Sequence, residues 1–207
     1  MVYSGECLDS LRETVKNRLS EKRFLHTLGV ERAAERLGKI FLPDNVSELR
    51  AAALLHDVAK EMPIDVQLDI LKKAKFELND DDMMSEGVVH SFTAPIVVKN
   101  DFPKFATENI LSSVLNHTVG SEDMTVFDKI IFISDYIEDT RTYPSCVAVR
   151  EMLYSSLQST FESERIIALN QACLASINAT FSSLEKRHLP INPRMEATKK
   201  SLEKQIL

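Results

Sequence analysis

Four side chains of the types that bind transition metals occur in this sequence where helices are expected. His56 and Asp57 are adjacent and follow the apolar run 51–55, while His26 lies upstream and Asp135 downstream. Neighbouring side chains on a helix point about 100° apart, so two of them can converge on one ion. A carboxylate buried beside such an apolar run is strongly destabilising unless a cation faces it. Asp57 therefore needs a cation, which Lys60 or a metal ion can supply.

The periodicity of two other helices turns His26 and Asp135 toward the interior. His26 shares an apolar stripe with Val30 in a helix expected over 21–39, and Ser20 is its expected N-cap. Asp135 comes four residues after Ile131 in a helix expected over 125–138, without a basic residue in its own turn. A bare carboxylate there is unfavourable. A lone inward histidine is usually a core residue with satisfied hydrogen bonds, so the interpretation depends on the whole set.

Together these residues offer two imidazoles and two carboxylates from three helices. Such a mixed nitrogen and oxygen set suits Fe, Mn, Co, Ni or Zn rather than Ca or Mg. An ion with four protein ligands and six positions leaves room for water and substrate, and it lowers the pKa of bound water and polarises phosphoryl oxygens. His90 and His117, also expected in apolar helical segments, would add donors around the open side.

The remaining pattern predicts an all-α protein with a single domain over 1–207. Gly numbers 5 and Trp is absent, while Leu, Ala, Glu and Lys are frequent. We expect the core to span about 20–187 and a C-terminal helix to cover 194–207. Further helices are expected over 6–19, 47–61 with Ser47 as N-cap, 65–74, from 91–93 to about 101 because of Pro95, 106–118, 144–156 and 162–186. The acidic run 77–86 is expected to be a solvated loop.

Composition excludes several classes of protein. The net charge of −6 argues against a general nucleic-acid binder, and no apolar run approaches the roughly 20 residues of a membrane span. The first residues lack the apolar core of a signal peptide. Three scattered cysteines without a CxxC pair are typical of reduced thiols, which predicts a cytoplasmic location. An acidic protein that handles phosphate would need local cations.

The order H…HD…D on helices resembles the HD-domain superfamily of metal-dependent phosphohydrolases. A narrower resemblance, to the bacterial symmetrical diadenosine tetraphosphate hydrolases of the YqeK type, covers about residues 20–195. It rests on four segments: RFLHTLGV at 23–30, LLHDVAK at 54–60, HTVG at 117–120 with Met124, and SDYIE at 134–138 with Arg141. The HTxG and DYIExxR segments are more specific than H…HD…D. The family often has Pro where this chain has Asp139.

The resemblance implies an HD-domain helical bundle that uses a divalent or trivalent metal, iron above all. It assigns the metal ligands as His26, His56, Asp57 and Asp135, and catalytic roles to Asp57, Lys60, His90 and His117. It also implies contacts with the phosphates or ribose of ADP from Arg23, His26, Asp57, Lys60, His90, His117, Thr118, Asp135 and Arg141. Water would attack the phosphate second from the nucleoside, so the products would be two ADP. The implied partners are a dinucleoside polyphosphate and ADP, without nucleic acid or membrane.

Three alternatives stay open on the sequence alone. The same metal site could serve a nucleotidase or a guanosine tetraphosphate hydrolase. A regulatory module could bind metal and nucleotide without turnover. A helical bundle could simply pair its buried histidines and acids with each other. The sequence does not decide between one ion and two, and it leaves the oligomeric state open, a dimer included.

Overall fold

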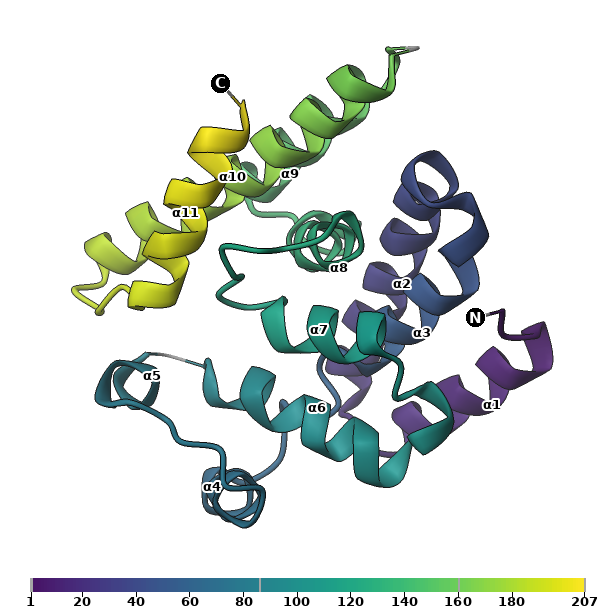
Figure 1. Ribbon diagram of the computed structural model, residues 1–207, viewed down its shortest axis with the longest axis vertical. Helices are drawn as coiled ribbons and strands as arrows, with labels where there is room; N and C mark the ends of the chain where they lie inside the picture. The colour runs from purple at the N-terminus through teal and green to yellow at the C-terminus, as the bar shows by residue number, and fades with distance from the viewer. Residues whose placement is uncertain (1, 86, 160, 207) are drawn as a thin grey trace.

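The computed structural model describes residues 2–85, 87–159 and 161–206, in which the helices are joined by loops and turns and strands are absent (Figure 1). The all-α prediction is therefore confirmed. The helices are α1 (Gly5–Lys16), α2 (Glu21–Phe41), α3 (Val46–Leu55), α4 (Ile64–Lys73), α5 (Asp80–Met84), α6 (Val89–Asp101), α7 (Glu108–Asn116), α8 (Val126–Ile137), α9 (Pro144–Ser156), α10 (Glu162–Lys186) and α11 (Pro193–Ile206), with short 3₁₀ helices η1 (Pro43–Asn45) and η2 (Pro103–Phe105).

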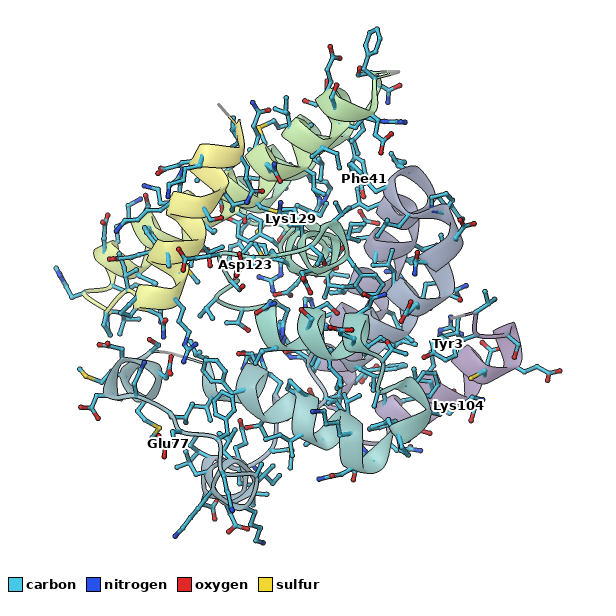
Figure 2. All side chains as sticks on the ribbon, in the orientation of Figure 1. Tyr3, Phe41, Glu77, Lys104, Asp123 and Lys129 are labelled. Atoms are coloured by element: carbon cyan, nitrogen blue, oxygen red, sulfur yellow. The ribbon has the colours of Figure 1, made fainter. Side chains whose placement is uncertain are left out.

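Helix α8 lies in the middle of the bundle. It packs against α2, α3 and α7 on one side and against α9 and α10 on the other (Figure 1). Ile130, Ile131 and Ile133 of α8 are fully buried. Lys129, labelled in Figure 2, donates from Nζ to the side-chain oxygen of Gln205 at 2.6 Å and so ties α8 to α11. The central helix thus places Asp135, whose side chain is 23% exposed, at the edge of the interior.

Side chains cap the starts of α2 and α8, and the first of these caps was predicted. The Ser20 hydroxyl accepts a hydrogen bond from the Arg23 amide at the start of α2, as expected. Thr125 and Asp128 form a reciprocal capping box at the start of α8. Both caps lie on helices that carry a member of the predicted metal set, so they fix where His26 and Asp135 face.

The bounds predicted for the helix over 47–61 were wrong at both ends. Helix α3 begins at Val46, and Ser47 lies inside it, where its hydroxyl accepts a hydrogen bond from the Tyr3 amide at 3.0 Å. The helix ends at Leu55, and His56 is its C-cap residue. Tighter turns follow, in which the Lys60 amide donates to the Asp57 carbonyl at 2.9 Å. His56 and Asp57 therefore lie on a tightened helix end rather than in a helix interior.

Helix α6 begins earlier than Pro95 suggested. It starts at Val89 and contains both His90 and Pro95. Proline lacks the amide that would bond one turn back. The Ser91 and Thr93 hydroxyls donate to the Val88 and Val89 carbonyls, at 2.8 and 3.0 Å, near the start of the helix. His90 therefore belongs to the first turn of this helix.

The acidic run 77–86 is not a solvated loop throughout. Residues 80–84 form α5, and Asp82 is fully buried. Asp82 accepts hydrogen bonds from Asn192 and from Arg194 at the start of α11, at 3.0–3.1 Å. Glu86, at the end of this run, and Leu207, at the end of the expected C-terminal helix, lie outside the described residues. Within the described residues, none of the helices combines the length and apolar character of a membrane span.

Candidate metal centre

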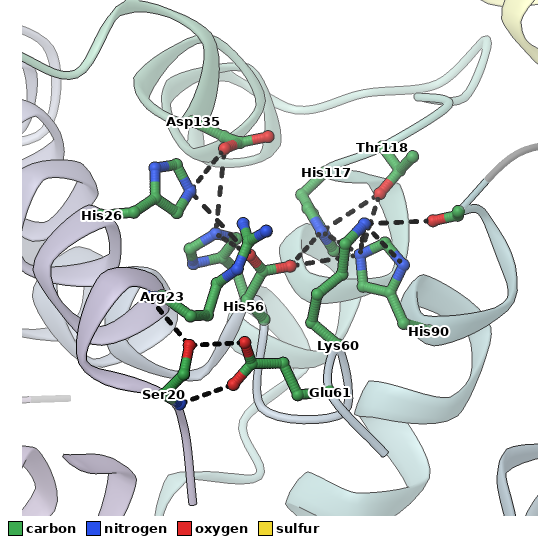
Figure 3. A network of polar contacts seen from close by, with 12 residues as sticks. Ser20, Arg23, His26, His56, Lys60, Glu61, His90, His117, Thr118 and Asp135 are labelled. Carbon is green, nitrogen blue, oxygen red and sulfur yellow. Dashed lines mark hydrogen bonds and ion pairs between the residues drawn. The ribbon is translucent and has the colours of Figure 1, made fainter. Parts of the chain in front are cut away.

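His56 and Asp57 meet side chains from two other helices at one buried point (Figure 3). His26 Nε2 lies 2.9 Å from Asp135 Oδ1 and 3.8 Å from Asp57 Oδ2. His56 Nε2 lies 3.4 Å from Asp57 Oδ2 and 3.9 Å from Asp135 Oδ1. His56 is completely buried, and Asp57 is only 3% exposed. The two imidazoles and two carboxylates expected from the sequence therefore converge, with α2, α3 and α8 each supplying at least one.

Hydrogen bonds fix the orientation of both histidine rings. His56 Nδ1 lies 2.6 Å from the Ala53 carbonyl oxygen, and His26 Nδ1 lies 3.1 Å from Glu138 Oε1. Both acceptors require a proton on Nδ1, which leaves the Nε2 lone pair free in the neutral ring. Each buried Nε2 faces carboxylate oxygens yet makes no aligned hydrogen bond to any described residue. This arrangement fits a cation between the two rings and the two carboxylates.

His90 and His117 form a second group on the opposite oxygen of Asp57. Their Nε2 atoms lie 3.2 and 3.6 Å from Asp57 Oδ1, and 3.0 Å from each other. His117 Nδ1 donates to the Val114 carbonyl at 2.7 Å, so its Nε2 also points toward Asp57. Asp57 therefore belongs to two groups of potential metal donors, one with His26 and His56 and one with His90 and His117.

The remaining predicted side chains surround these donors. Arg23 donates to Asp57 Oδ2 at 2.9 Å, and Arg141 donates to Asp135 Oδ1 at 2.7 Å. Lys60 Nζ lies 3.3 Å from the Gly87 carbonyl oxygen and 3.3 Å from His90 Nδ1. The Thr118 hydroxyl lies 3.1 Å from His117 Nε2. The side chains predicted to line the site thus lie around one cluster (Figure 3). Arg141 reaches this cluster through Asp135.

The local charges favour ionised carboxylates. Burial opposes the charged form of Asp57, but the neighbouring His56, His117 and His90 hold its pKa well below the usual range. Burial likewise opposes the charge of Asp135, while Arg141 and His26 hold its pKa well below the usual range. The cluster therefore presents two carboxylates at neutral pH.

The pKa values of His90 and Lys60 are lowered in these surroundings, whereas the pKa of His26 is raised. Burial lowers the pKa of His90 to about 4 despite the neighbouring Asp57. Burial also lowers the pKa of Lys60. Burial opposes the charged form of His26, yet the neighbouring carboxylates of Asp135 and Glu138 raise its pKa to about 9. A metal ion that binds His26 would have to displace the proton from its Nε2 atom, so metal binding and protonation compete.

Glu138 contacts the candidate metal ligand His26, and the sequence predicted no role for it. Its side chain is fully buried, and it accepts hydrogen bonds from the Thr140 amide and hydroxyl as well as from His26. A Cβ atom on Gly29 would lie 2.2 Å from Glu138 Oε2, so only glycine leaves room for this carboxylate. One sequence signal was available: an acid at the C-terminal end of an apolar helix opposes the helix dipole and needs donors.

Two hollows open on either side of the cluster. One has a volume of about 520 Å³ and is lined by Ser20, Lys22, Arg23, His26, Glu61, Glu138, Thr140, Arg141, Thr142 and Tyr143. The other has a volume of about 320 Å³ and is lined by Lys60, Ile64, Gln67, Met83, Met84, Ser85, Gly87, Val89 and His90. Each hollow is lined by a residue close to Asp57: Arg23 in the larger one and His90 in the smaller one.

Comparison with known proteins agrees with this geometry. The model of the HD domain family matches residues 23–140, which hold all four candidate metal ligands. The chain is 31% identical over 179 residues to a symmetrical bis(5'-nucleosyl)-tetraphosphatase of Bacillus subtilis, covering 86% of this chain and 88% of that one. It is 29% identical over 184 residues to an enzyme of the same name from Staphylococcus aureus, covering 86% and 92%.

A solved structure shares the entire fold. A predicted HD superfamily hydrolase involved in NAD metabolism from Clostridium acetobutylicum superposes with a TM-score of 0.82 at 26% sequence identity, over 99% of this chain and 100% of that chain. HD-domain proteins bind divalent metal, and two buried groups of side chains in this chain could hold such an ion: His26, His56 and Asp57, and Asp57, His90 and His117. The chain belongs to the HD-domain family, in the branch of the symmetrical bis(5'-nucleosyl)-tetraphosphatases.

Proposed function

We propose that this protein is a metal-dependent hydrolase that cleaves diadenosine tetraphosphate symmetrically into two ADP. The observation that carries the proposal is the convergence of His26, His56, Asp57 and Asp135, with both Nε2 atoms turned inward by fixed Nδ1 hydrogen bonds. The names of the similar enzymes from Bacillus subtilis and Staphylococcus aureus supply the substrate class. The thiols of the three cysteines are free, in keeping with the cytoplasmic location that we propose.

His26, His56, Asp57 and Asp135 would hold the metal, which we propose to be iron, with Mn, Co, Ni or Zn as the other ions suited to these donors. When bound, such an ion lowers the pKa of water and polarises a phosphoryl oxygen. The chain orients the donors in advance, because the Ala53 carbonyl and Glu138 hold the two imidazoles. His90 and His117 sit on the other oxygen of Asp57, where they can contact a phosphate.

The cations and the threonine hydroxyl beside the cluster suit a tetraphosphate. We propose that the phosphates or ribose contact Arg23, Lys60, His90, His117, Thr118 and Arg141 besides the metal set. These residues supply local positive charge in a chain whose net charge is −6. Electrostatic complementarity of this kind positions phosphoryl groups and steers their approach. The ammonium group of Lys60, beside His90, is placed to offset charge that develops on the departing ADP.

A substrate panel tests the proposal. The metal-loaded protein is incubated with diadenosine tetraphosphate, a nucleoside monophosphate and guanosine tetraphosphate, and the products are separated by chromatography. We expect the tetraphosphate to give the highest kcat/KM and ADP to be the product. Preference for the monophosphate or for guanosine tetraphosphate would replace the substrate assignment. Tight binding of ADP without any turnover would show that the protein is a binding module and not an enzyme.

A further inference from the structure

The two oxygens of Asp57 divide the site into two sides. Oδ2 faces Arg23, His26 and His56, at 2.9, 3.8 and 3.4 Å. Oδ1 faces His90 and His117, at 3.2 and 3.6 Å. Figure 3 shows Arg23 and His26 on one side of the cluster and Lys60 and His90 on the other. The larger hollow opens on the Oδ2 side and the smaller one on the Oδ1 side.

A symmetrical cut requires room for two nucleoside diphosphates. Water adds its oxygen to one central phosphorus, the bridging oxygen leaves with the other ADP, and a proton completes the balance. The bond that breaks lies at the middle of the substrate, so each half must extend to its own side of the reacting phosphorus. A protein with a hollow on each side of its central carboxylate can accommodate both halves at once.

We infer that the larger hollow is the binding site for one of the two ADP halves, with its phosphates on Lys22 and Arg23 and its base against the ring of Tyr143. The other half then lies on the side of Lys60, His90 and Thr118. This inference rests on the proposed function and adds to it a second subsite, in which Lys22 and Tyr143 acquire a role. Arg141 lines the same hollow and is bonded to Asp135.

The charge balance of this hollow favours phosphate. It is lined by three cations, Lys22, Arg23 and Arg141, and by two carboxylates. Arg23 and Arg141 also pair with Asp57 and Asp135 at the cluster. Both carboxylates are already occupied: Glu61 accepts hydrogen bonds from the Ser20 amide and hydroxyl at 2.6 Å each, and Glu138 accepts from His26 and Thr140.

Lys22 is the cation without another role in this hollow. It is exposed, and it makes no ion pair or hydrogen bond with a described residue through its side chain. An ammonium group on a flexible stem is a point charge suited to phosphate. Lys22 can therefore reach the anion without breaking a contact of the fold.

Tyr143 supplies an aromatic face at the rim. Its side chain is 70% exposed and lies at the edge of the charged hollow. Its backbone is held as the N-cap of α9, where its carbonyl accepts a hydrogen bond from the Val147 amide at 3.0 Å, and Pro144 follows it. A fixed backbone with an exposed ring is a suitable platform for stacking a nucleobase.

The test compares two substrates, of which only one carries a second nucleoside: diadenosine tetraphosphate and adenosine 5'-tetraphosphate. Tyr143→Ala should lower kcat/KM for diadenosine tetraphosphate about tenfold, the effect of one lost stacking contact. It should leave kcat/KM for adenosine tetraphosphate unchanged. If the latter compound binds without being cleaved, its inhibition constant replaces kcat/KM. Lys22→Ala should lower kcat/KM for both substrates, because both carry the phosphates.

Controls separate this role from a structural one. Tyr143→Phe should keep full activity, because it keeps the ring. Phe161→Ala removes an aromatic side chain of similar exposure, 65%, from the start of α10. It should leave kcat/KM unchanged for both substrates. Lys200→Ala, on α11, is the matched control for Lys22→Ala.

The subsite inference is overturned if Tyr143→Ala affects both substrates equally or affects neither. It is also overturned if Tyr143→Phe loses as much activity as Tyr143→Ala. A wild-type protein that does not turn over diadenosine tetraphosphate would instead refute the proposed function, and the wild-type measurement alone shows this. The two failures are therefore distinguishable in one set of assays.

Discussion

At the scale of single residues, Glu138 decides how His26 presents its Nε2 atom. Outer carboxylates that fix a ligating imidazole typically contribute 10–100-fold to metal affinity, so Glu138→Ala should weaken metal binding by about that factor. Glu138→Gln should retain more affinity, because its carbonyl oxygen can still accept the proton of His26 Nδ1. The dissociation constant of the metal, measured by titration of the metal-free protein, checks this.

Substitutions at Gly29 and Gly5 form a matched pair that tests whether Glu138 orients His26. Gly29→Ala would force Glu138 to move, since the added Cβ would meet its carboxylate oxygen at 2.2 Å, whereas a Cβ on Gly5 meets nothing within 4 Å. Gly29→Ala should therefore weaken metal binding as Glu138→Ala does, and Gly5→Ala should not. Unchanged metal affinity in both Gly29→Ala and Glu138→Ala would contradict the role given to Glu138.

Lys60 should act on substrate and not on the metal. Its Nζ contacts His90 and the Gly87 carbonyl but none of the four candidate metal ligands. Lys60→Ala should therefore raise KM or lower kcat/KM, by about 10- to 100-fold if one charge-assisted phosphate contact is lost, with metal content intact. Metal analysis and steady-state kinetics on the same preparation test the prediction. Loss of metal from this variant would show that the assignment is wrong.

At the scale of elements, the contact between α5 and α11 holds the C-terminal helix to the bundle. Arg194 forms two hydrogen bonds to the fully buried Asp82. Arg194→Ala should lower the free energy of unfolding by roughly 1–2 kcal/mol, a value reduced for water screening because the Arg194 side chain is 44% exposed. Lys73→Ala breaks a surface pair with Asp69 and should cost less than about 0.5 kcal/mol in the same denaturant titration.

The same contact should respond to acid with a defined sign. Burial opposes the charge of Asp82, but hydrogen bonds from Arg194 and Asn192 lower its pKa below the ordinary value of an aspartate. A group whose pKa falls on folding contributes stability that is present above its unfolded pKa and is lost as the pH drops through its folded pKa. The difference in stability between wild type and Arg194→Ala should therefore be largest near neutral pH and shrink below about pH 4. A constant difference from pH 7 to pH 3 would contradict this account.

Much of the helical pattern was predictable because periodicity and caps act locally. The bounds expected for α9 and α10 agree with the structure, and Ser20 caps α2 as expected. The errors arose where tertiary contacts override local signals. Ser47 bonds to Tyr3, 44 residues away, instead of capping α3. Asp82 is buried because Arg194, 112 residues away, neutralises it, and a sequence of neighbouring acids carries no sign of such a partner.

The site was predictable to the extent that helix phase turns polar side chains inward. That argument brought His26 and Asp135 toward His56-Asp57, and the structure places them within 4 Å. It did not show that Asp57 would face two histidines on each side, nor that Glu138 would orient His26. Both features depend on how α6, α7 and α8 meet, which is a property of packing and not of spacing along the chain.

At the scale of the whole molecule, metal binding and activity should be lost together. His56→Ala or Asp57→Ala removes one of four proposed ligands, and with it charge balance and geometry. We expect bound metal and turnover to disappear in both variants, while thermal stability changes only moderately because the other acids can be hydrated through the open side. Metal analysis, kinetics and thermal unfolding with and without chelator check this. Full activity after complete chelation would refute metal dependence.

The central claim is that water attacks one of the two middle phosphates, with the other ADP as the leaving group. The most direct measurement is hydrolysis of diadenosine tetraphosphate in ¹⁸O water, with the products resolved by chromatography and mass spectrometry. The proposed geometry predicts ADP as the only nucleotide product, with ¹⁸O on the β-phosphate of one ADP in each turnover. AMP and ATP as the main products would contradict both the symmetrical cleavage and the placement of one ADP half on each side of Asp57.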